Sequence, residues 1–420
     1  MYQATIINVW KDDPIFDYCA SVTGKGNNLY NASLFRIRQV MTGIKKDPKD
    51  RQPNEVAVLK EIEEALPSMQ TKKQTFKMPT PEKWLLSYTF LDALFKRTNN
   101  PDYNAEGLPK HMAQNAIKEA LEDMKGFFEL SKMFKRNPSS LTGKPNLPHY
   151  KKSGGHCTVT SSKQESQIKK DQDGNVTLQL PLTKTRIFLP RYLSDAKLVE
   201  VQIKPYYNGY RISVITDNGK EPKTPKEERK RIIAIDLGVS NFAAITNNIG
   251  EPCLLFKGGV VKSTNQWYNK KMAQLKSEQT IGTKNKFKPT PESNDLCAWR
   301  DNRFRDLMHK YSKAIIQWSI DHNIDTIVVG ENKGWKQNSN MGKENNQEFV
   351  SIPFTIFKKY LSYRSEAAGI KLIFAEESYT SKGSFLDRDK IPTYGKDDKD
   401  VSFSGLRGPT IYKGLRRPGN

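Results

Sequence analysis

The chain has 420 residues, which is enough for two or three domains with cores of their own. It carries 68 Lys and Arg residues against 46 Asp and Glu residues, and its formal net charge is +22. Such a charge attracts polyanions, of which nucleic acid is the obvious one. The N-terminus has no apolar signal core and no run approaches the length of a membrane span, so we expect a cytoplasmic protein.

The four cysteines lie far apart in the sequence and form no Cys-x-x-Cys pair. They therefore support neither a zinc ribbon nor a disulfide framework, and a reducing compartment is expected. These cysteines are Cys19, Cys157, Cys253 and Cys297.

The first predicted element is a strand over residues 3–10, which is rich in β-branched side chains. Apolar residues then recur at helical spacing within residues 29–40 and 112–128. The simplest interpretation is a helical insertion from about residue 28 to residue 134.

A connector rich in Pro and Gly, residues 137–155, follows the helical region. Four short strands come next and predict a small barrel or sandwich. They cover residues 176–180, 185–189, 198–204 and 210–216. If the opening strand pairs with them, the helices are an insertion into a β-module, and a basic linker leads into a further domain.

Two acids mark this further domain. The stretch from Arg231 to Asn241 places Asp236 at the centre of a predicted buried strand, where a charge is costly unless a cation or substrate compensates it. A second strand, residues 325–329, runs through Gly330 into Glu331. A single Asp at a strand end is often a turn former or helix cap. Two acids on two strands of one sheet are typical of a nuclease metal site of the RNase H type.

The elements around these acids support this interpretation. Apolar runs at residues 242–246 and 253–256 precede a long helical region, and a helix over residues 353–368 and a strand over residues 371–375 follow Glu331. Three strands, a helix, a strand, a helix and a strand are the order of an RNase H-like sheet, in which the first and fourth strands are neighbours.

The basic residues are clustered. Residues 131–152 contain six Lys or Arg residues and no acid, and residues 401–420 also contain no acid. One such cluster is usually a solvated face. Several clusters interleaved with aromatic residues that could stack on bases favour a nucleic-acid channel. The aromatic residues are Tyr150, Trp267, Tyr268, Trp335 and Tyr379.

Several phrases in this order resemble TnpB, the RNA-guided nuclease family of bacterial insertion sequences, which is related to the miniature type V CRISPR effectors. The phrases lie at residues 28–38, 235–241, 265–270, 330–333 and 378–382. Each is weak alone, whereas their order and spacing together are fairly specific.

The resemblance implies an α/β plus β-barrel protein of four segments. Residues 1–27 and 137–220 would form a wedge-type β-barrel, and residues 28–136 a helical recognition lobe inserted into it. Residues 221–420 would form a RuvC domain with the RNase H-like fold. Such proteins bind a guide RNA and cut target DNA that pairs with it.

The resemblance also implies the site. Asp236 would be the first RuvC acid and Glu331 the second, and together they would hold Mg²⁺, with Mn²⁺ as a possible substitute. Basic and aromatic side chains would contact the nucleic acids. The candidates are Tyr30, Arg36, Arg38, Lys144, Lys151, Lys152, Lys333 and Lys336.

The chain departs from the family pattern in two ways. Residues 382–387 lack the paired cysteines that form a zinc-binding insert in many members, so no zinc is expected. The family's third acid lies in an Asn-Ala-Asp phrase that opens a C-terminal helix, and neither the phrase nor a helix-forming composition is present. The acids available instead are Asp387, Asp389, Asp397, Asp398 and Asp400.

Two alternatives remain open at this point. A chain without the third acid could bind DNA under RNA guidance and cut poorly or not at all, acting as a repressor or competitor. The phrase around Asp236 also looks like the phosphate loop of the actin and sugar-kinase superfamily. A second phosphate loop and an adenosine motif, which those ATPases require, are not found in the sequence.

Overall fold

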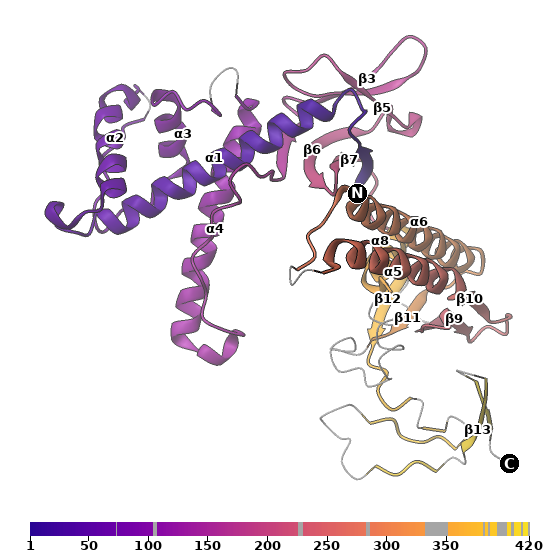
Figure 1. Cartoon of the computed structure of the whole chain (residues 1–420). Helices are drawn as coiled ribbons and strands as arrows, with labels where there is room; N and C mark the ends of the chain where they lie inside the picture. Colours follow the sequence, from indigo (N-terminus) through magenta and orange to yellow (C-terminus); the bar gives the residue numbers. More distant parts are fainter. Residues whose placement is uncertain are drawn as a thin grey trace. The chain divides into compact units, whose positions relative to one another are not determined.

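The computed structural model forms two compact units, Met1–Lys220 and Glu221–Asn420, which are considered separately (Figure 1). No helix in the described part of the chain is long and apolar enough to cross a membrane. The described residues are 1–72, 74–103, 107–225, 230–282, 286–331, 352–380, 383–384, 387–392 and 401–404, together with the backbone of residues 407–412 and 415–418.

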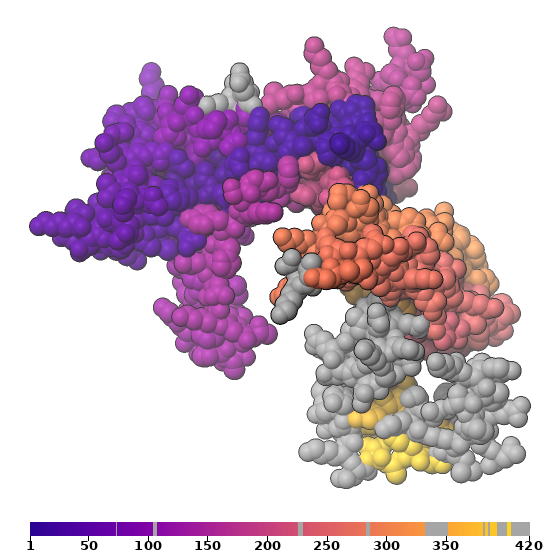
Figure 2. Space-filling view, viewed as in Figure 1, coloured from indigo at the N-terminus to yellow at the C-terminus, as the bar shows by residue number. Residues whose placement is uncertain are grey.

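The first unit contains four long helices. They are α1 (Phe16–Gly43), α2 (Pro53–Met69), α3 (Tyr88–Arg97) and α4 (Lys110–Arg136). Helix α1 packs on α2 and α4 and buries Leu34, Ile37 and Val40 completely. In Figures 1 and 2 the C-terminal half of α4 projects from the rest of this unit. Short 3₁₀ helices cover Pro48–Asp50, Pro138–Ser140 and Arg191–Leu193.

Helix α1 begins earlier than the sequence pattern predicts. Residues 16–27, expected in the β-module, form its first turns. Their buried side chains, Cys19 and Val22, continue the helical spacing of the later apolar residues. Gly26 allows close packing against a strand, because an ideal Cβ atom there would lie 2.5 Å from Cγ1 of Val159.

Two sheets complete the first unit. An antiparallel sheet has the order β1-β7-β6-β2, with β1 (Tyr2–Val9), β7 (Gly209–Asp217), β6 (Lys197–Tyr206) and β2 (Val159–Ser162). The other has the order β3-β4-β5, with β3 (Gln167–Lys170), β4 (Val176–Gln179) and β5 (Arg186–Leu189). The opening strand pairs with one of the later strands, because β1 pairs with β7, and the condition for a helical insertion into a β-module is met. Strands β2 and β3 were not predicted.

The second unit is built on a mixed sheet of order β10-β9-β8-β11-β12. Its strands are β8 (Ile232–Leu237), β9 (Asn241–Asn247), β10 (Leu254–Lys257), β11 (Thr326–Gly330) and β12 (Lys371–Ala375). The helices are α5 (Gly259–Thr280), α6 (Pro291–Asp321) and α8 (Phe354–Ala368). Strands β8, β11 and β12 are parallel neighbours, so the predicted adjacency of the first and fourth strands is confirmed.

One face of this mixed sheet carries the core of the second unit. Ile233, Ile235 and Val329 on the strands pack with Phe357 of α8 and Ile316 of α6. This packing fixes the register of the parallel strands, because a shift by one residue would turn their apolar side chains to the opposite face.

The C-terminal residues contain no helix where the structure describes them. The backbone of residues 407–412 and 415–418 forms the antiparallel strands β13 (Arg407–Tyr412) and β14 (Leu415–Pro418). The absence of the family's C-terminal helix, predicted from the Gly and Pro content of residues 405–419, stays a prediction.

Candidate acidic site and nucleic-acid interface

Asp236 is the next-to-last residue of β8. Its neighbours Ile235 and Leu237 are buried, at 2% exposure each, whereas Asp236 points to the opposite face and is exposed. The expectation that Asp236 is buried is therefore wrong. Successive strand residues alternate between the faces, and an apolar run with one acid can be read as a strand buried on both faces.

Glu331 directly follows β11 and is held at both its backbone and its side chain. Its backbone N–H donates to the carbonyl oxygen of Ala375, at 2.8 Å. Its Oε1 accepts a hydrogen bond from Nζ of Lys358 on α8, at 2.9 Å between heavy atoms. The Lys358 side chain is only 14% exposed. An intramolecular ammonium therefore neutralises this carboxylate.

A third acid, Glu377, lies beside the other two. It comes two residues after β12, and its side chain covers Gly330, because an ideal Cβ atom on Gly330 would lie 1.8 Å from Oε2 of Glu377. Burial raises the pKa of the Glu377 carboxyl above its usual range, and the nearby charge of Asp236 raises it further. Lys358 acts on the pKa of Glu377 in the opposite direction.

The sequence analysis missed Glu377, although a signal was present. Glu376 and Glu377 follow the strand predicted at residues 371–375, just as Glu331 follows the neighbouring strand. Because the carboxyl ends of parallel strands meet at one edge of a sheet, acids that follow two such strands are brought together.

The three acids supply donors suited to a hard divalent cation. Asp236, Glu331 and Glu377 lie at the carboxyl ends of three neighbouring parallel strands, and carboxylate oxygens are the ligands that Mg²⁺ prefers. In the described residues, however, no three His, Cys, Asp or Glu side chains are placed to hold a metal ion. In this arrangement the ammonium of Lys358 occupies Oε1 of Glu331. The metal role of these acids stays a prediction.

Five acids were predicted as possible replacements for the family's third acid, and of these only Asp387 and Asp389 are among the described residues. Oδ2 of Asp389 accepts from the backbone N–H of Ser384, at 2.8 Å, and Asp389 also accepts from the hydroxyl of Ser404. The carboxylate of Asp389 thus ties two loop segments together. Asp387 is exposed in the same loop. Asp397, Asp398 and Asp400 lie outside the described residues.

Tyr30 is not available to stack on a base. Its side chain is 2% exposed, and its hydroxyl donates to Oδ2 of Asp123 at 2.6 Å. The ammonium of Lys151 lies 3.8 Å from its ring centroid. The prediction that Tyr30 contacts nucleic acid is therefore corrected: its position in the α1 pattern places it between α1 and α4, in the core.

Three of the predicted basic contacts have partners within the first unit. Arg36 donates from Nε and Nη2 to the two carboxylate oxygens of Glu61. The guanidinium of Arg38 lies 5.0 Å from the ring centroid of Tyr150, and Nζ of Lys151 lies 2.8 Å from Oε1 of Glu119. Arg36 in particular is 15% exposed, so its first role is to join α1 to α2.

Lys144 and Lys152 are exposed, as a phosphate contact requires. Lys152 and Lys151 line a cavity of about 530 Å³ on the first unit, together with Lys204 and His156. Its remaining lining residues are Asn27, Glu119, Gly155, Cys157, Thr158 and Pro205. Lys333, Lys336 and Trp335 lie outside the described residues.

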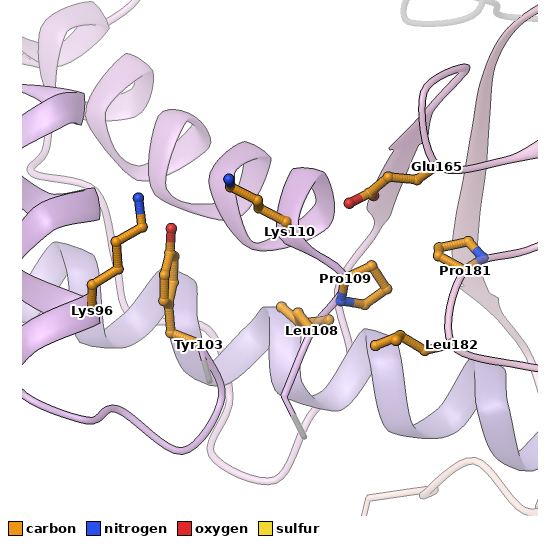
Figure 3. A pocket seen from close by; sticks show the side chains of 8 residues that line it. All are labelled: Lys96, Tyr103, Leu108, Pro109, Lys110, Glu165, Pro181 and Leu182. Carbon is orange, nitrogen blue, oxygen red and sulfur yellow. The ribbon is translucent and has the colours of Figure 1, made fainter. Parts of the chain in front are cut away.

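A second cavity, of about 390 Å³, lies at the start of α4 (Figure 3). Lys96, Tyr103 and Lys110 line one side of it and Glu165 and apolar side chains the other. Oε1 of Glu165 accepts from the backbone N–H of His111, at 2.9 Å, in the first turn of α4. Glu165 therefore stabilises the N-terminus of α4, because the first N–H groups of a helix have no hydrogen-bond partner within the helix. The apolar lining residues are Leu108, Pro109, Pro181 and Leu182.

The segment that contains Asp236 and Glu331 matches a known protein family. Residues 211–336 match the family OrfB_IS605, described as a probable transposase. The predicted resemblance to TnpB is confirmed for this segment. It contains Asp236 and Glu331, and it ends before Glu377.

None of the curated proteins matches the chain. Among solved structures, the chain is similar to the protein of a Cas12f1–sgRNA–target DNA complex, with 11% identity, a TM-score of 0.48, and coverage of 91% of this chain and 90% of that one. It is also similar to C2c1 of Alicyclobacillus acidoterrestris in complex with single-guide RNA. There the identity is 7%, the TM-score is 0.48, and the coverage is 99% of this chain and 87% of that one.

Proposed function

We propose that the chain is a transposon-associated, RNA-guided DNA endonuclease of the TnpB type. One observation carries the proposal: Asp236, Glu331 and Glu377 follow or end three neighbouring parallel strands, and the first two lie in the segment that matches the transposase family. Acids at one edge of such a sheet are what metal-assisted hydrolysis of a phosphodiester requires.

The sheet order supports an RNase H-like fold for residues 221–420. Counted from β8, the strands lie in the order three, two, one, four, five, and only the second runs antiparallel to the first, fourth and fifth. In the first unit, we propose that the β1-β7-β6-β2 and β3-β4-β5 sheets belong to a wedge-type barrel formed by residues 1–27 and 137–220. The helical recognition lobe of residues 28–136 would then extend back to residue 16.

Each acid has its own part in the proposed site. Asp236, Glu331 and Glu377 would hold Mg²⁺, or Mn²⁺ in its place, through their carboxylate oxygens. The bound ion would supply activation of water and stabilisation of the leaving oxygen. Because Lys358 binds Oε1 of Glu331, the ion would either displace Lys358 from that oxygen or bind Glu331 through Oε2. Lys358 would thereafter be available to balance the charge of a DNA phosphate.

Guide RNA and target DNA are the proposed partners. The net charge of +22 and the exposed Lys144 and Lys152 provide sequence-independent attraction to phosphates. Recognition of the target sequence would come from base pairing between the guide and the DNA strand, so no large set of base-reading side chains is needed.

The experiment that tests this function identifies the RNA. The protein is purified from its host, the co-purified RNA is sequenced, and binding is measured to a DNA duplex that contains the matching sequence and to a scrambled duplex. A discrete RNA species with selective binding of the matching DNA supports the proposal. Bound nucleotide without RNA, or equal affinity for the two duplexes, contradicts it.

A guided DNA-binding protein that does not cut is the second candidate. It shares the guide and the target with the first candidate and differs from it only in lacking cleavage. The guide experiment gives the same result for both candidates. A plasmid cleavage assay in Mg²⁺ separates the two candidates, because only the first predicts cleavage.

A further inference from the structure

The three-stranded sheet of the first unit has one face packed on the core, and its opposite face exposes Lys169 and Phe188 of the outer strands, whereas Thr177 of the central strand is 5% exposed. Leu178 and Ile187 of β4 and β5 are 0% and 8% exposed and belong to the core. Residues directly opposite each other in an antiparallel pair point to the same face. The pairing of Lys169 with Thr177, and of Thr177 with Phe188, therefore places these three side chains in one row on the other face.

Phe188 dominates this row. It is 73% exposed, although its neighbours on β5, Ile187 and Leu189, are buried. A large ring left in water on a regular strand forgoes the free energy that its burial would contribute. The side chains of β5 that face the core are Ile187 and Leu189. Packing of this sheet therefore does not require an aromatic residue at position 188.

The surroundings of Phe188 are basic. Lys169 is exposed at the end of its row, and Arg186 is exposed in the next row, which Gln167 and Gln179 complete. The hairpin also exposes Lys170 and Lys184. The acids nearby are in the turn between β3 and β4, where Asp171 accepts from the backbone N–H of Asn175, at 2.7 Å.

We propose that this face, centred on Phe188 and flanked by Lys169 and Arg186, is a stacking site for an unpaired base of single-stranded RNA. A ring stacks on any base, and the flanking cations hold the adjacent phosphates. The inference rests on the nucleic-acid binding in the proposed function and adds a position for a base that the guide leaves unpaired.

The chemistry favours a single strand over a duplex. Bases of a duplex are stacked on each other and their faces are closed to a side chain, so a duplex would contact Lys169 and Arg186 but not the ring of Phe188. It also favours RNA over an acidic protein, since an acidic peptide would use the cations and leave the ring without a partner of matching shape.

Anisotropy of a fluorescein-labelled single-stranded oligouridine, added to the full chain freed of bound RNA, tests the site. Phe188→Leu keeps an apolar side chain but removes the aromatic face, and we expect about five- to one-hundred-fold weaker binding of this probe. Phe188→Trp should bind as well as the unmodified chain. An RNA duplex of the same length should bind all three proteins equally.

Tyr2→Leu is the matched control. Tyr2 is also 73% exposed and lies on a strand of the same unit, but it pairs with Asp217, so its surroundings do not favour a phosphate. Its replacement should leave both affinities unchanged. Thermal melting of each variant checks that the first unit stays folded.

The outcomes separate this inference from the proposed function. Unchanged oligouridine binding by Phe188→Leu overturns the stacking site alone, as does an equal loss for oligouridine and duplex. Failure of the unmodified chain to bind either RNA overturns the stacking site together with the proposed function. A selective loss of single-strand binding that Phe188→Trp restores supports it.

Discussion

The side chain of Glu377 lies directly over Gly330, and an ideal Cβ atom on Gly330 would lie 1.8 Å from Oε2 of Glu377. A side chain at position 330 would therefore require the Glu377 carboxylate, the end of a flexible side chain, to move, although φ at Gly330 is not positive. This contact lies at the ends of β11 and β12. The Glu377 carboxylate is close enough to Asp236 that the charge of Asp236 raises the pKa of Glu377.

Gly330→Ala should displace the Glu377 carboxylate from the end of β11 and lower the stability of the second unit by less than about 1 kcal/mol, because the displaced group ends a flexible side chain. Removal of the second partner should relieve the overlap, so the double variant Gly330→Ala with Glu377→Ala should be more stable than Gly330→Ala alone. Thermal melting measures both. Gly126→Ala is the control, because nothing lies within 4 Å of a Cβ atom at that helical position. A double variant no more stable than Gly330→Ala alone would contradict an overlap between Glu377 and a side chain at position 330.

Asp236→Asn and Glu331→Gln should abolish Mg²⁺-dependent DNA cleavage and leave RNA and DNA binding nearly unchanged. Ligation of a cation and attraction of phosphates are separate roles, and each substitution keeps the shape of the side chain. Glu366→Gln, at an exposed position of α8, is the control. Normal cutting by either variant would remove that residue from the active site.

Lys358→Met should tighten binding of divalent cations to the acidic edge. The substitution removes the ammonium that lies 2.9 Å from Oε1 of Glu331 and leaves an apolar chain of similar length. Titration calorimetry with Mn²⁺ on the protein without nucleic acid measures the affinity independently of cleavage. Lys359→Met, at the adjacent exposed position, is the control. Weaker Mn²⁺ binding by Lys358→Met than by the control would contradict competition between Lys358 and the metal.

RNA binding should weaken steeply with salt, because each phosphate contact releases counterions. Joint replacement of Lys144 and Lys152 by Ala should lower the slope of log affinity against log salt by about 2, or about one for each lost phosphate contact. Lys151→Ala should change it less, since Lys151 already binds Glu119. A slope near zero for the unmodified chain would contradict the electrostatic account.

Glu55 should make the stability of the first unit depend on pH. Hydrogen bonds from Lys46, Thr42 and the backbone of Gln52 lower its pKa to about 2, below the value of about 4.3 for an unfolded chain. A lowered carboxyl pKa stabilises the fold above the unfolded pKa, and this contribution is lost as the pH falls towards the folded value.

Glu55→Gln should therefore lower the melting temperature at neutral pH, at a cost of about 1–3 kcal/mol. The difference from the unmodified chain should shrink as the pH falls below about 4, as linkage requires. Glu63→Gln, exposed on the same helix, is the control. A difference that stays constant from neutral pH to acid would show that Glu55 contributes through packing and not through its charge.

Periodicity predicted the strands and helices of the second unit closely, because β8, β11 and β12 are short apolar runs bounded by Gly or polar residues. It failed for the start of α1, where Phe16, Cys19 and Val22 continue the pattern before the first predicted helical residue. The first turns of α1 pack against residues far along the chain, as Gly26 does against Val159, and a local sequence pattern does not contain such partners.

The candidate site was predictable in part. A motif pointed to Asp236 and Glu331, but Glu377 has no motif and emerges only when β12 lies beside β11. Tyr30 shows the opposite limit: the sequence predicted that it contacts nucleic acid, whereas in the structure it is buried and its hydroxyl donates to Asp123. Composition gives the charge of a region, whereas the fold decides which side chains are neutralised within it.

Cleavage of a supercoiled plasmid tests the central claim most directly. The plasmid carries the sequence matching the co-purified RNA, and the unmodified chain is added over a series of Mg²⁺ concentrations, with Glu377→Gln in parallel. The account predicts Mg²⁺-dependent double-strand cleavage by the unmodified chain and a large loss for Glu377→Gln. Guided binding without cleavage at any Mg²⁺ concentration, or full cleavage by Glu377→Gln, would contradict it.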